Sequence, residues 1–394
     1  EATNYCIITD HRNLVYAGNA NGIMEYDGTE WRFIPVRPGA HVTALNISPS
    51  GTIYVGSERE FGLLAIDRAG SLKYQSLSEY LPEKDRNFSA IWAVHVSSEL
   101  IAFQSYECIF TFQDDSLHAI YPETSFHTSF MVNSSLYARE RGLGLRVLQG
   151  NEFITVQGGE IFKDLGIFGM FPYDETGKIL ICTQENGFYL MDPFRGIERM
   201  PTENDDFLIA AGVFGGIALS DSNIALNTFR EGVIISDREG RIRTIINKSG
   251  GLNAEDVKGI WQDRYQNIWC ALNNGISKID YFSHLSMYQE DAGLEGGVNT
   301  LVRFENKLYV GTTSGLFVET NADVLNLSLA FRSLPIVKDQ VWSLKVVEGY
   351  LVASTSNGLF IIRIGVARKI SGMNVFTLFY LEKEKRLLAG GNSG

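Results

Sequence analysis

The chain has 394 residues, of which 45% are apolar and 12% aromatic, and only 9 are proline. This composition excludes a disordered chain. The formal net charge is −12 with no basic tract, so long-range electrostatics repel nucleic acid and anionic membrane surfaces, and we expect no nucleic-acid partner for this region.

Short apolar runs flank polar turns that close on glycine along the whole chain. Residues 14–27 read LVYAGNANGIMEYD, and residues 267–280, 308–320 and 351–363 repeat the pattern. The turn glycines lie about 42 residues apart, at Gly22, Gly62, Gly144, Gly187, Gly232, Gly275, Gly315, Gly358 and Gly394. The double interval after Gly62 contains a degenerate repeat around Tyr106. A fixed interval of this kind indicates a repeat architecture.

A second signature precedes each hairpin, because every repeat places a small residue before a large apolar one. The pairs are Cys6–Ile7, Ala44–Leu45, Ala93–Val94, Ser129–Phe130, Gly169–Met170, Gly216–Ile217, Gly259–Ile260, Thr300–Leu301, Ser343–Leu344 and Thr377–Leu378. This alternation predicts a strand with one tightly packed face and one face that fills space.

Each repeat holds four strands, shown in the seventh by VKGIWQD, NIWCAL, ISKIDYF and LSMYQE. A four-stranded antiparallel unit of about 40–45 residues predicts a β-propeller blade. The fold class is therefore all-β, with about nine and a half blades. We expect a seven-bladed propeller over 1–290 and the first blades of a second propeller over 291–394; one larger ring is the alternative.

The unit QDRYQNIWCALNNGISKIDYF resembles the two-component regulator propeller repeat. The matching positions are Asp263, Asn267, Ile268, Trp269, Gly275, Ile276, Lys278 and Asp280, and residues 13–35 and 307–317 match as well. The resemblance implies a periplasmic sensor region of bacteroidete-type signalling proteins. It also implies a triple-tyrosine domain, a membrane helix and a histidine kinase or DNA-binding output as partners outside this chain.

Motifs for catalysis or metal binding are not found in the sequence. Its six histidines form no HExxH or HxH pattern, and no GxSxG anchors a nucleophile. The four cysteines, Cys6, Cys108, Cys182 and Cys270, have no CxxC or metal spacing. We expect no enzyme activity in this region, no metal and no cofactor.

Departures from the repeat indicate a candidate binding rim. Where most second strands end in glycine or alanine, other blades place larger polar residues, and the turns that follow carry arginines. Those turns share a rim with the connections around the central channel, where propellers bind ligands. The candidate ligand-binding residues are Arg59, Gln104, Arg139, Arg141, Asn227 and Arg230, with Trp92 and Trp342 as stacking faces.

Simpler interpretations of the same residues remain open. The arginines could be solvated turn residues paired with Glu60, Glu140 and Glu231, and the tryptophans could pack between blades. The insertions at 78–88 and 201–212 could be lids or spacers.

Three functions are compatible with these features. The first is an extracytoplasmic sensor module that binds a small molecule or saccharide at the rim, or forms a homodimer, and passes the change to parts outside this chain. The alternatives are a propeller hydrolase or lyase and a plain protein-interaction scaffold.

Overall fold

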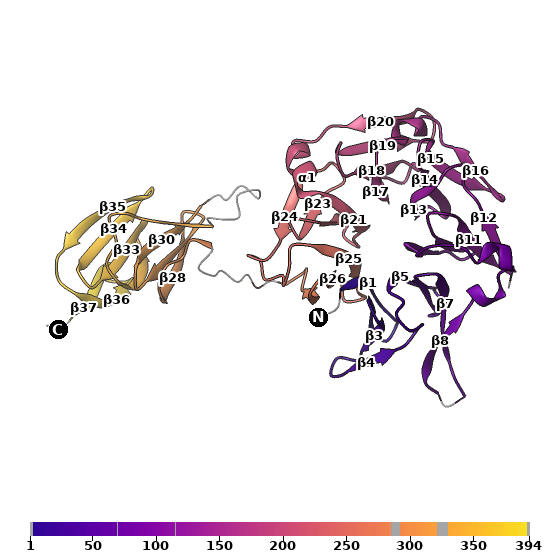
Figure 1. Cartoon of the computed structure of the whole chain (residues 1–394). Helices are drawn as coiled ribbons and strands as arrows, with labels where there is room; N and C mark the ends of the chain where they lie inside the picture. Colours follow the sequence, from indigo (N-terminus) through magenta and orange to yellow (C-terminus); the bar gives the residue numbers. More distant parts are fainter. Residues whose placement is uncertain are drawn as a thin grey trace. The chain divides into compact units, whose positions relative to one another are not determined.

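The computed structural model describes residues 3–68, 70–114, 116–283, 285, 292–320 and 330–391. The chain divides into two compact units, Glu1–Ser283 and His284–Gly394 (Figure 1). Almost all regular structure is antiparallel β-sheet, with neighbouring strands joined in chain order. The predicted all-β propeller fold is confirmed.

The first three blades of the first unit are four-stranded sheets. Blade 1 contains β1 (Asn4–Thr9), β2 (Val15–Asn19), β3 (Gly22–Tyr26) and β4 (Trp31–Ile34). Blade 2 contains β5 (Val42–Ile47), β6 (Ile53–Ser57), β7 (Glu60–Ile66) and β8 (Leu72–Ser76). Blade 3 contains β9 (Ala93–Val96), β10 (Ile101–Gln104), β11 (Ile109–Gln113) and β12 (Ser116–Ile120).

Four more blades complete the first unit. Blade 4 contains β13 (Phe126–Val132), β14 (Ser135–Glu140), β15 (Gly144–Gln149) and β16 (Glu152–Thr155). Blade 5 contains β17 (Ile167–Pro172), β18 (Ile179–Thr183), β19 (Phe188–Asp192) and β20 (Gly196–Met200). Blade 6 contains β21 (Val213–Ala218), β22 (Ile224–Thr228), β23 (Val233–Ser236) and β24 (Ile242–Ile246). Blade 7 contains β25 (Val257–Gln262), β26 (Ile268–Leu272) and β27 (Gly275–Ile279); the fourth strand expected there falls mostly outside the described residues.

The seven sheets fan out around a central axis, with the first strand of each blade innermost (Figure 1). Blade 7 packs against blade 1 and closes the ring. The indole nitrogen of Trp261 donates a hydrogen bond of 3.0 Å to Thr9 Oγ1, and Asn4 Nδ2 donates one of 2.8 Å to the carbonyl of Gly275. A buried seam of Ile7, Val15, Trp269 and Ala271 lies between the two blades.

Close approach between blades explains the small residues of the repeat. A Cβ atom on Gly56 would lie 2.5 Å from Ile91 Cγ2 of the next connection, so only glycine fits there. Large apolar residues fill the space between sheets. The cluster between blades 2 and 3 stacks Phe61 on Phe103 and Phe110, with ring centroids 4.5 and 4.9 Å away.

The predicted insertions contain short helices. Residues 78–88 include the 3₁₀ turns Ser78–Tyr80 and Glu83–Asp85, and residues 201–212 include α1 (Asp205–Ala211). A third 3₁₀ turn, Gly159–Phe162, connects blades 4 and 5. Among the described residues, no helix has the length and apolar character needed to cross a membrane.

The second unit continues the same repeat. One sheet contains β28 (Val298–Phe304), β29 (Lys307–Thr312), β30 (Gly315–Glu319) and β31 (Phe331–Ser333). The next contains β32 (Val341–Val347), β33 (Tyr350–Thr355), β34 (Gly358–Arg363) and β35 (Val366–Ser371), and a hairpin of β36 (Val375–Leu381) and β37 (Arg386–Gly391) follows. That these sheets begin a second propeller, with a boundary at 290/291, stays a prediction.

Candidate functional site

In six of the seven blades, the innermost strand carries one unpaired extra residue near its start. In blade 3, Trp92 takes the equivalent position directly before β9, and its backbone N–H donates to Gln104 O at 2.8 Å. In blade 5, Ile167 pairs with Thr183 and Gly169 pairs with Cys182, so Phe168 has no partner of its own. Such a β-bulge bends the strand and re-aims the side chain of the extra residue. The residues at this position in the seven blades are Tyr5, Thr43, Trp92, His127, Phe168, Phe214 and Lys258.

All seven of these side chains line one cavity, which we call the channel mouth. It encloses about 670 Å³, and its wall also includes Gln104 at the end of β10 and Tyr106 and Phe229 from turns after second strands. The position that repeats around the ring therefore becomes a single site only because the ring closes. Aromatic side chains dominate this site, as is typical of ligand pockets.

The aromatic rings of the channel mouth contact one another along its edge. Trp92 lies 5.5 Å from Tyr106 between centroids, and His127 meets Phe168 edge to face at 5.4 Å. Phe168 and Phe214 follow at 6.1 Å. These contacts hold flat apolar faces in place before any ligand arrives, which lowers the entropic cost of binding.

Two buried acceptors of the channel mouth lack partners. Gln104 is 1% exposed; its Nε2 donates to the carbonyl of Ser105 at 2.9 Å, while its Oε1 has no partner among the described residues. His127 Nδ1 is also buried without a partner there. Burial, followed by the charges of Arg139 and Arg141, lowers the pKa of His127 to about 4. The imidazole is therefore neutral at physiological pH and can accept or donate one hydrogen bond.

Two cations lie over aromatic faces at the channel mouth. The guanidinium of Arg141 lies 5.6 Å from the ring centroid of Tyr106, and Lys258 Nζ lies 5.4 Å from that of Phe229. Lys258 also pairs with Asp256 at 2.8 Å. The side chain of Arg141 has no carboxylate within 4 Å among the described residues, so it remains available to a ligand.

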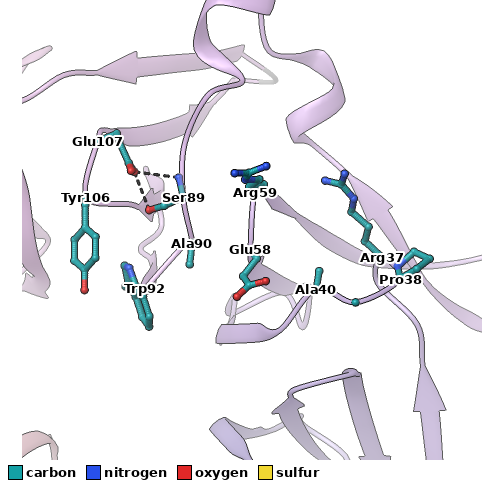
Figure 2. A pocket seen from close by; sticks show the side chains of 11 residues that line it. Arg37, Pro38, Ala40, Glu58, Arg59, Ser89, Ala90, Trp92, Tyr106 and Glu107 are labelled. Carbon is teal, nitrogen blue, oxygen red and sulfur yellow. Dashed lines mark hydrogen bonds between the residues drawn. The ribbon is translucent and has the colours of Figure 1, made fainter.

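A flanking cavity of about 640 Å³ lies between blades 2 and 3, and we call it the Arg59 cavity (Figure 2). Arg59 sits in a turn at φ 53°, a left-handed conformation that is uncommon for a non-glycine residue. The turn is fixed because the backbone N–H of Arg59 donates to Ser89 O at 2.7 Å. Figure 2 shows the guanidinium groups of Arg37 and Arg59 on one side of this backbone and the carboxylate of Glu58 on the other.

A second flanking cavity of about 440 Å³ lies between blades 4 and 5, and we call it the Arg141 cavity. It is lined by Arg139, Arg141, Lys163, Asp164 and Glu185, among others. Arg139 is 6% exposed and donates from Nε to Phe162 O at 3.0 Å and from Nη2 to Lys163 O at 2.6 Å. Burial and the neighbouring charge of Arg141 lower the pKa of Arg139.

The three cavities are neighbours along the rim and share lining residues. The Arg59 cavity shares Trp92 and Tyr106 with the channel mouth, and the Arg141 cavity shares His127 and Phe168 with it. We call the three cavities together the cleft; aromatic side chains form the shared walls, and arginines line the two flanking cavities.

The candidates predicted from the sequence fall into three groups. Trp92, Gln104, Arg59, Arg139 and Arg141 line the cleft; their role in binding stays a prediction.

Asn227 and Arg230 line none of the three cavities. Asn227 is 2% exposed and donates from Nδ2 to Val257 O at 2.9 Å, which ties blade 6 to blade 7. Arg230 donates to the carbonyl of Ala210 at 2.7 Å. Trp342 belongs to the second unit, where it meets Phe376 at 5.4 Å.

Five residues of the channel mouth were not predicted from the sequence: Tyr5, Thr43, His127, Phe214 and Lys258. Their signal was available, because each directly precedes the small residue of the small–large pair or lies two positions before it. Only the bulge, which the sequence does not reveal, turns this position towards the channel.

The expected pairing of rim arginines with turn glutamates is wrong. Glu60 accepts hydrogen bonds from Tyr74 and Ser76, and Glu140 pairs with Arg146 across the strand at 2.7 Å. Within the described part of the chain, no ion pair joins Arg59 to Glu60 or Arg141 to Glu140. The rim cations are therefore not neutralised by the adjacent glutamates.

The four cysteines are free thiols, and burial raises the pKa of Cys6, Cys108 and Cys270 to about 12. They are therefore unreactive thiols at neutral pH. In the described ranges, no three His, Cys, Asp or Glu side chains gather in a way that could hold a metal ion.

Comparison with known proteins gives structural similarity only. No protein-family model matches the chain, and no curated protein matches it by sequence. Among solved structures, the chain is similar to the extracellular domain of a protein named as a hybrid two-component system, BT3049 from B. thetaiotaomicron. The TM-score is 0.64 at 16% identity, covering 99% of this chain and 56% of the other.

Other propellers match about 70% of the chain. The WD40 propeller domain of Doa1 has a TM-score of 0.55 at 12% identity, covering 71% of this chain and 92% of its own. Virginiamycin B lyase from Staphylococcus aureus has a TM-score of 0.54 at 16% identity, covering 69% and 92%. At identities this low, the similarity shows the fold alone. The chain spans about half the length of the two-component structure. The predicted resemblance to extracellular domains of two-component proteins is confirmed at this level: the chain is similar in fold, over nearly its whole length, to such a domain.

Proposed function

We propose that the first unit is an extracytoplasmic ligand-sensing propeller of a two-component-type signalling protein and that it binds a saccharide or similar small molecule at the channel mouth. The observation that carries this proposal is the convergence of the equivalent residue of all seven blades on one cavity. Similarity to an extracellular two-component domain over 99% of the chain supports the sensor role.

The chemistry of the channel mouth fits a saccharide. Sugar rings present flat C–H faces that pack on aromatic rings, and Trp92, Phe168 and Phe214 offer such faces. Sugar hydroxyls need both donors and acceptors, and the polar side chains of Gln104, His127 and Lys258 line the channel mouth. Hydrogen bonds between these side chains and ligand hydroxyls would add to the stacking on the aromatic rings.

Signalling would follow if binding favours one arrangement of the protein over another. The response would then pass to a kinase or DNA-binding output outside this chain, or act through a homodimer. The proposal assigns no catalytic step to the channel mouth.

Binding of oligosaccharides to Trp92→Ala tests the proposal. Loss of an aromatic anchor typically costs 2 kcal/mol or more, so affinity for a ligand found by screening the wild type should fall roughly 30-fold. Isothermal titration calorimetry measures the change. Trp31→Ala is the matched control, because Trp31 is 44% exposed on the outer strand β4 and Trp92 is 45% exposed. Equal affinities in both variants would contradict binding at the channel mouth.

A further inference from the structure

Several arginines of the ring pair with carboxylates, as in Arg199–Asp205 at 2.7 Å and Arg241–Asp237 at 2.9 Å. Others donate to backbone carbonyls, as Arg238 does to Tyr173 O at 2.6 Å. In the Arg141 cavity, none of Arg139, Arg141 and Lys163 has a carboxylate within 4 Å among the described residues. In a chain with a net charge of −12, unpaired cations gathered in one cavity need an explanation.

Arg139 is the most informative of these cations. It is a guanidinium only 6% exposed, and its hydrogen bonds go to the carbonyls of Phe162 and Lys163. Carbonyl oxygens satisfy its donors but do not cancel its charge, and the opposing effect of Asp164 on its pKa is smaller than those of burial and Arg141. A buried charge that is only partly compensated is costly, and an anion at close range would offset that cost.

The charges that line the Arg141 cavity also favour an anion. Asp164 and Glu185 also line it, against three cations, so the wall keeps a positive excess. The charges of Arg139 and Arg141 are strong enough at His127 to lower its pKa in addition to the effect of burial. Arginine forks favour planar or tetrahedral oxyanions such as carboxylate and sulfate.

The position of the cavity relates this anion site to the channel mouth. His127 and Phe168 form a wall common to both. A sugar ring stacked on Phe168 would therefore extend its substituents towards Arg141 and Lys163. The Arg59 cavity at the other end differs, because Arg37 and Arg59 are matched there by Glu58 and Glu107.

Glu107 in that second cavity is already engaged. Its Oε2 accepts hydrogen bonds from the backbone N–H of Ser89 at 3.1 Å and from Ser89 Oγ at 3.0 Å. The Arg59 cavity thus offers balanced charge and polar contacts, while the Arg141 cavity offers a positive excess. The two flanking cavities therefore differ in the balance of charges on their walls.

We infer that the ligand of the cleft is an acidic oligosaccharide whose carboxylate or sulfate group occupies the Arg141 cavity while a sugar ring stacks in the channel mouth. This inference rests on the proposed saccharide-binding function. It assigns the selection of charge to Arg141 and Lys163, with Arg139 as the positioning residue that fixes the connection carrying Lys163.

Matched pairs of ligands test the charge requirement by calorimetry. One pair is an oligogalacturonate and its fully methyl-esterified form, and the other is a sulfated galactan oligosaccharide and its desulfated form. We expect the acidic member of at least one pair to bind 10-fold or more tightly than its neutral form. The pair that shows the preference identifies carboxylate or sulfate as the group recognised.

Variants assign the preference to the cavity. Arg141→Gln and Lys163→Gln should each weaken binding of the acidic member about 10-fold, the loss of one charge-assisted hydrogen bond, and leave the neutral member unchanged. Trp92→Ala should weaken both members. The control is Arg195→Gln, an exposed arginine of the β19–β20 turn outside the cleft, which should change neither.

The outcomes separate the inference from the proposed function. Equal binding of acidic and neutral members, lost in Trp92→Ala but retained in Arg141→Gln, would overturn the acidic ligand and keep the saccharide site. Failure of all four ligands to bind the wild type at millimolar concentration would overturn both. An acidic preference retained in Arg141→Gln and Lys163→Gln would overturn the role of the Arg141 cavity.

Discussion

The ring and the second unit contain the same repeat, but equivalent apolar side chains are buried to different extents in them. The large residue of the small–large pair is 8% exposed at Leu45 in the ring and 62% exposed at Leu301 in the first sheet of the second unit. In the next sheet of that unit the equivalent Leu344 is again 7% exposed. The sequence position is the same in all three, so the neighbouring blade decides whether the residue is buried.

This difference shows that a blade cannot cover its own faces. In the ring each blade has a neighbour on both sides, because β25 and β26 pack against β1. Stability in this architecture therefore comes from contacts between blades more than from pairing within one blade.

The candidate binding site also depends on how neighbouring blades are arranged. Asn299, Trp342 and Phe376 occupy the bulge position in the second unit. There the bulged residues of consecutive blades touch, as Trp342 and Phe376 do at 5.4 Å, much as His127 and Phe168 do in the ring. In the ring, seven such positions converge on one cavity.

Truncation of the large residue gives the largest expected effect. Leu45→Ala should lower the free energy of unfolding of the ring by about 3 kcal/mol, since it removes a buried leucine from a packed core. Leu301→Ala should cost less than about 1 kcal/mol, because most of the side chain is already in water. Urea unfolding followed by pulse proteolysis measures the two units separately.

Leu344→Ala is the matched control within the second unit and should cost about as much as Leu45→Ala. A Leu301→Ala variant as damaging as Leu344→Ala would show that the exposed face is covered in solution. The difference in burial between Leu45 of the ring and Leu301 of the second unit would then not hold in solution.

Exchange of the small residue gives a smaller effect. Gly259 lies where blade 7 meets blade 1, and a Cβ atom there would be 2.9 Å from Tyr5 O and 3.3 Å from Cys6 Cα. Gly259→Thr, which introduces the residue found at position 300, should destabilise the ring by about 2 kcal/mol through overpacking against backbone. Urea unfolding of the ring measures it.

The reverse exchange, Thr300→Gly, should cost only about 0.5–1 kcal/mol, the usual effect of glycine within a strand. Equal costs for the two exchanges would mean that the seam between blades 7 and 1 is no tighter than the corresponding position of the second unit.

The sequence was sufficient for the strands and the repeat, because both depend on local patterns of apolar and small residues. It was insufficient for the bulge. One unpaired residue shifts the inward–outward alternation by one position, and the sequence alone does not show where that shift occurs. Phe214 and His127 thus looked like ordinary strand residues. Polar departures from the repeat were also ambiguous: Arg139 and Asn227 are both buried and both bind backbone carbonyls of the following connection or blade. Replacing a glycine by a polar residue can mark a contact between blades as well as a binding surface.

Acid should lower the free energy of unfolding of the ring more than that of the second unit, by less than the cost expected for Gly259→Thr. Burial lowers the pKa of His95 to about 4, and the pKa of His127 is also about 4, against an ordinary value near 6.5. Between pH 6.5 and 4 the unfolded chain binds more protons than the folded ring, so stability falls as the pH falls through this window. His284 is the last histidine of the sequence, so the described strands of the second unit contain none.

From pH 7.5 to 5.5, His95 alone should reduce the stability of the ring by about 1 kcal/mol. Hydrogen exchange measured by mass spectrometry, corrected for the intrinsic pH dependence, should show protection lost in β9 and β10 and retained in β32 and β33. His95→Gln should flatten the dependence, because Ser129, which contacts His95 Nε2 at 2.8 Å, no longer faces a group that titrates in this range. His118→Gln, on the exposed outer strand β12, serves as the control. An equal loss of protection in both units would assign the acid sensitivity to carboxylates common to them, and not to the buried histidines that only the ring contains.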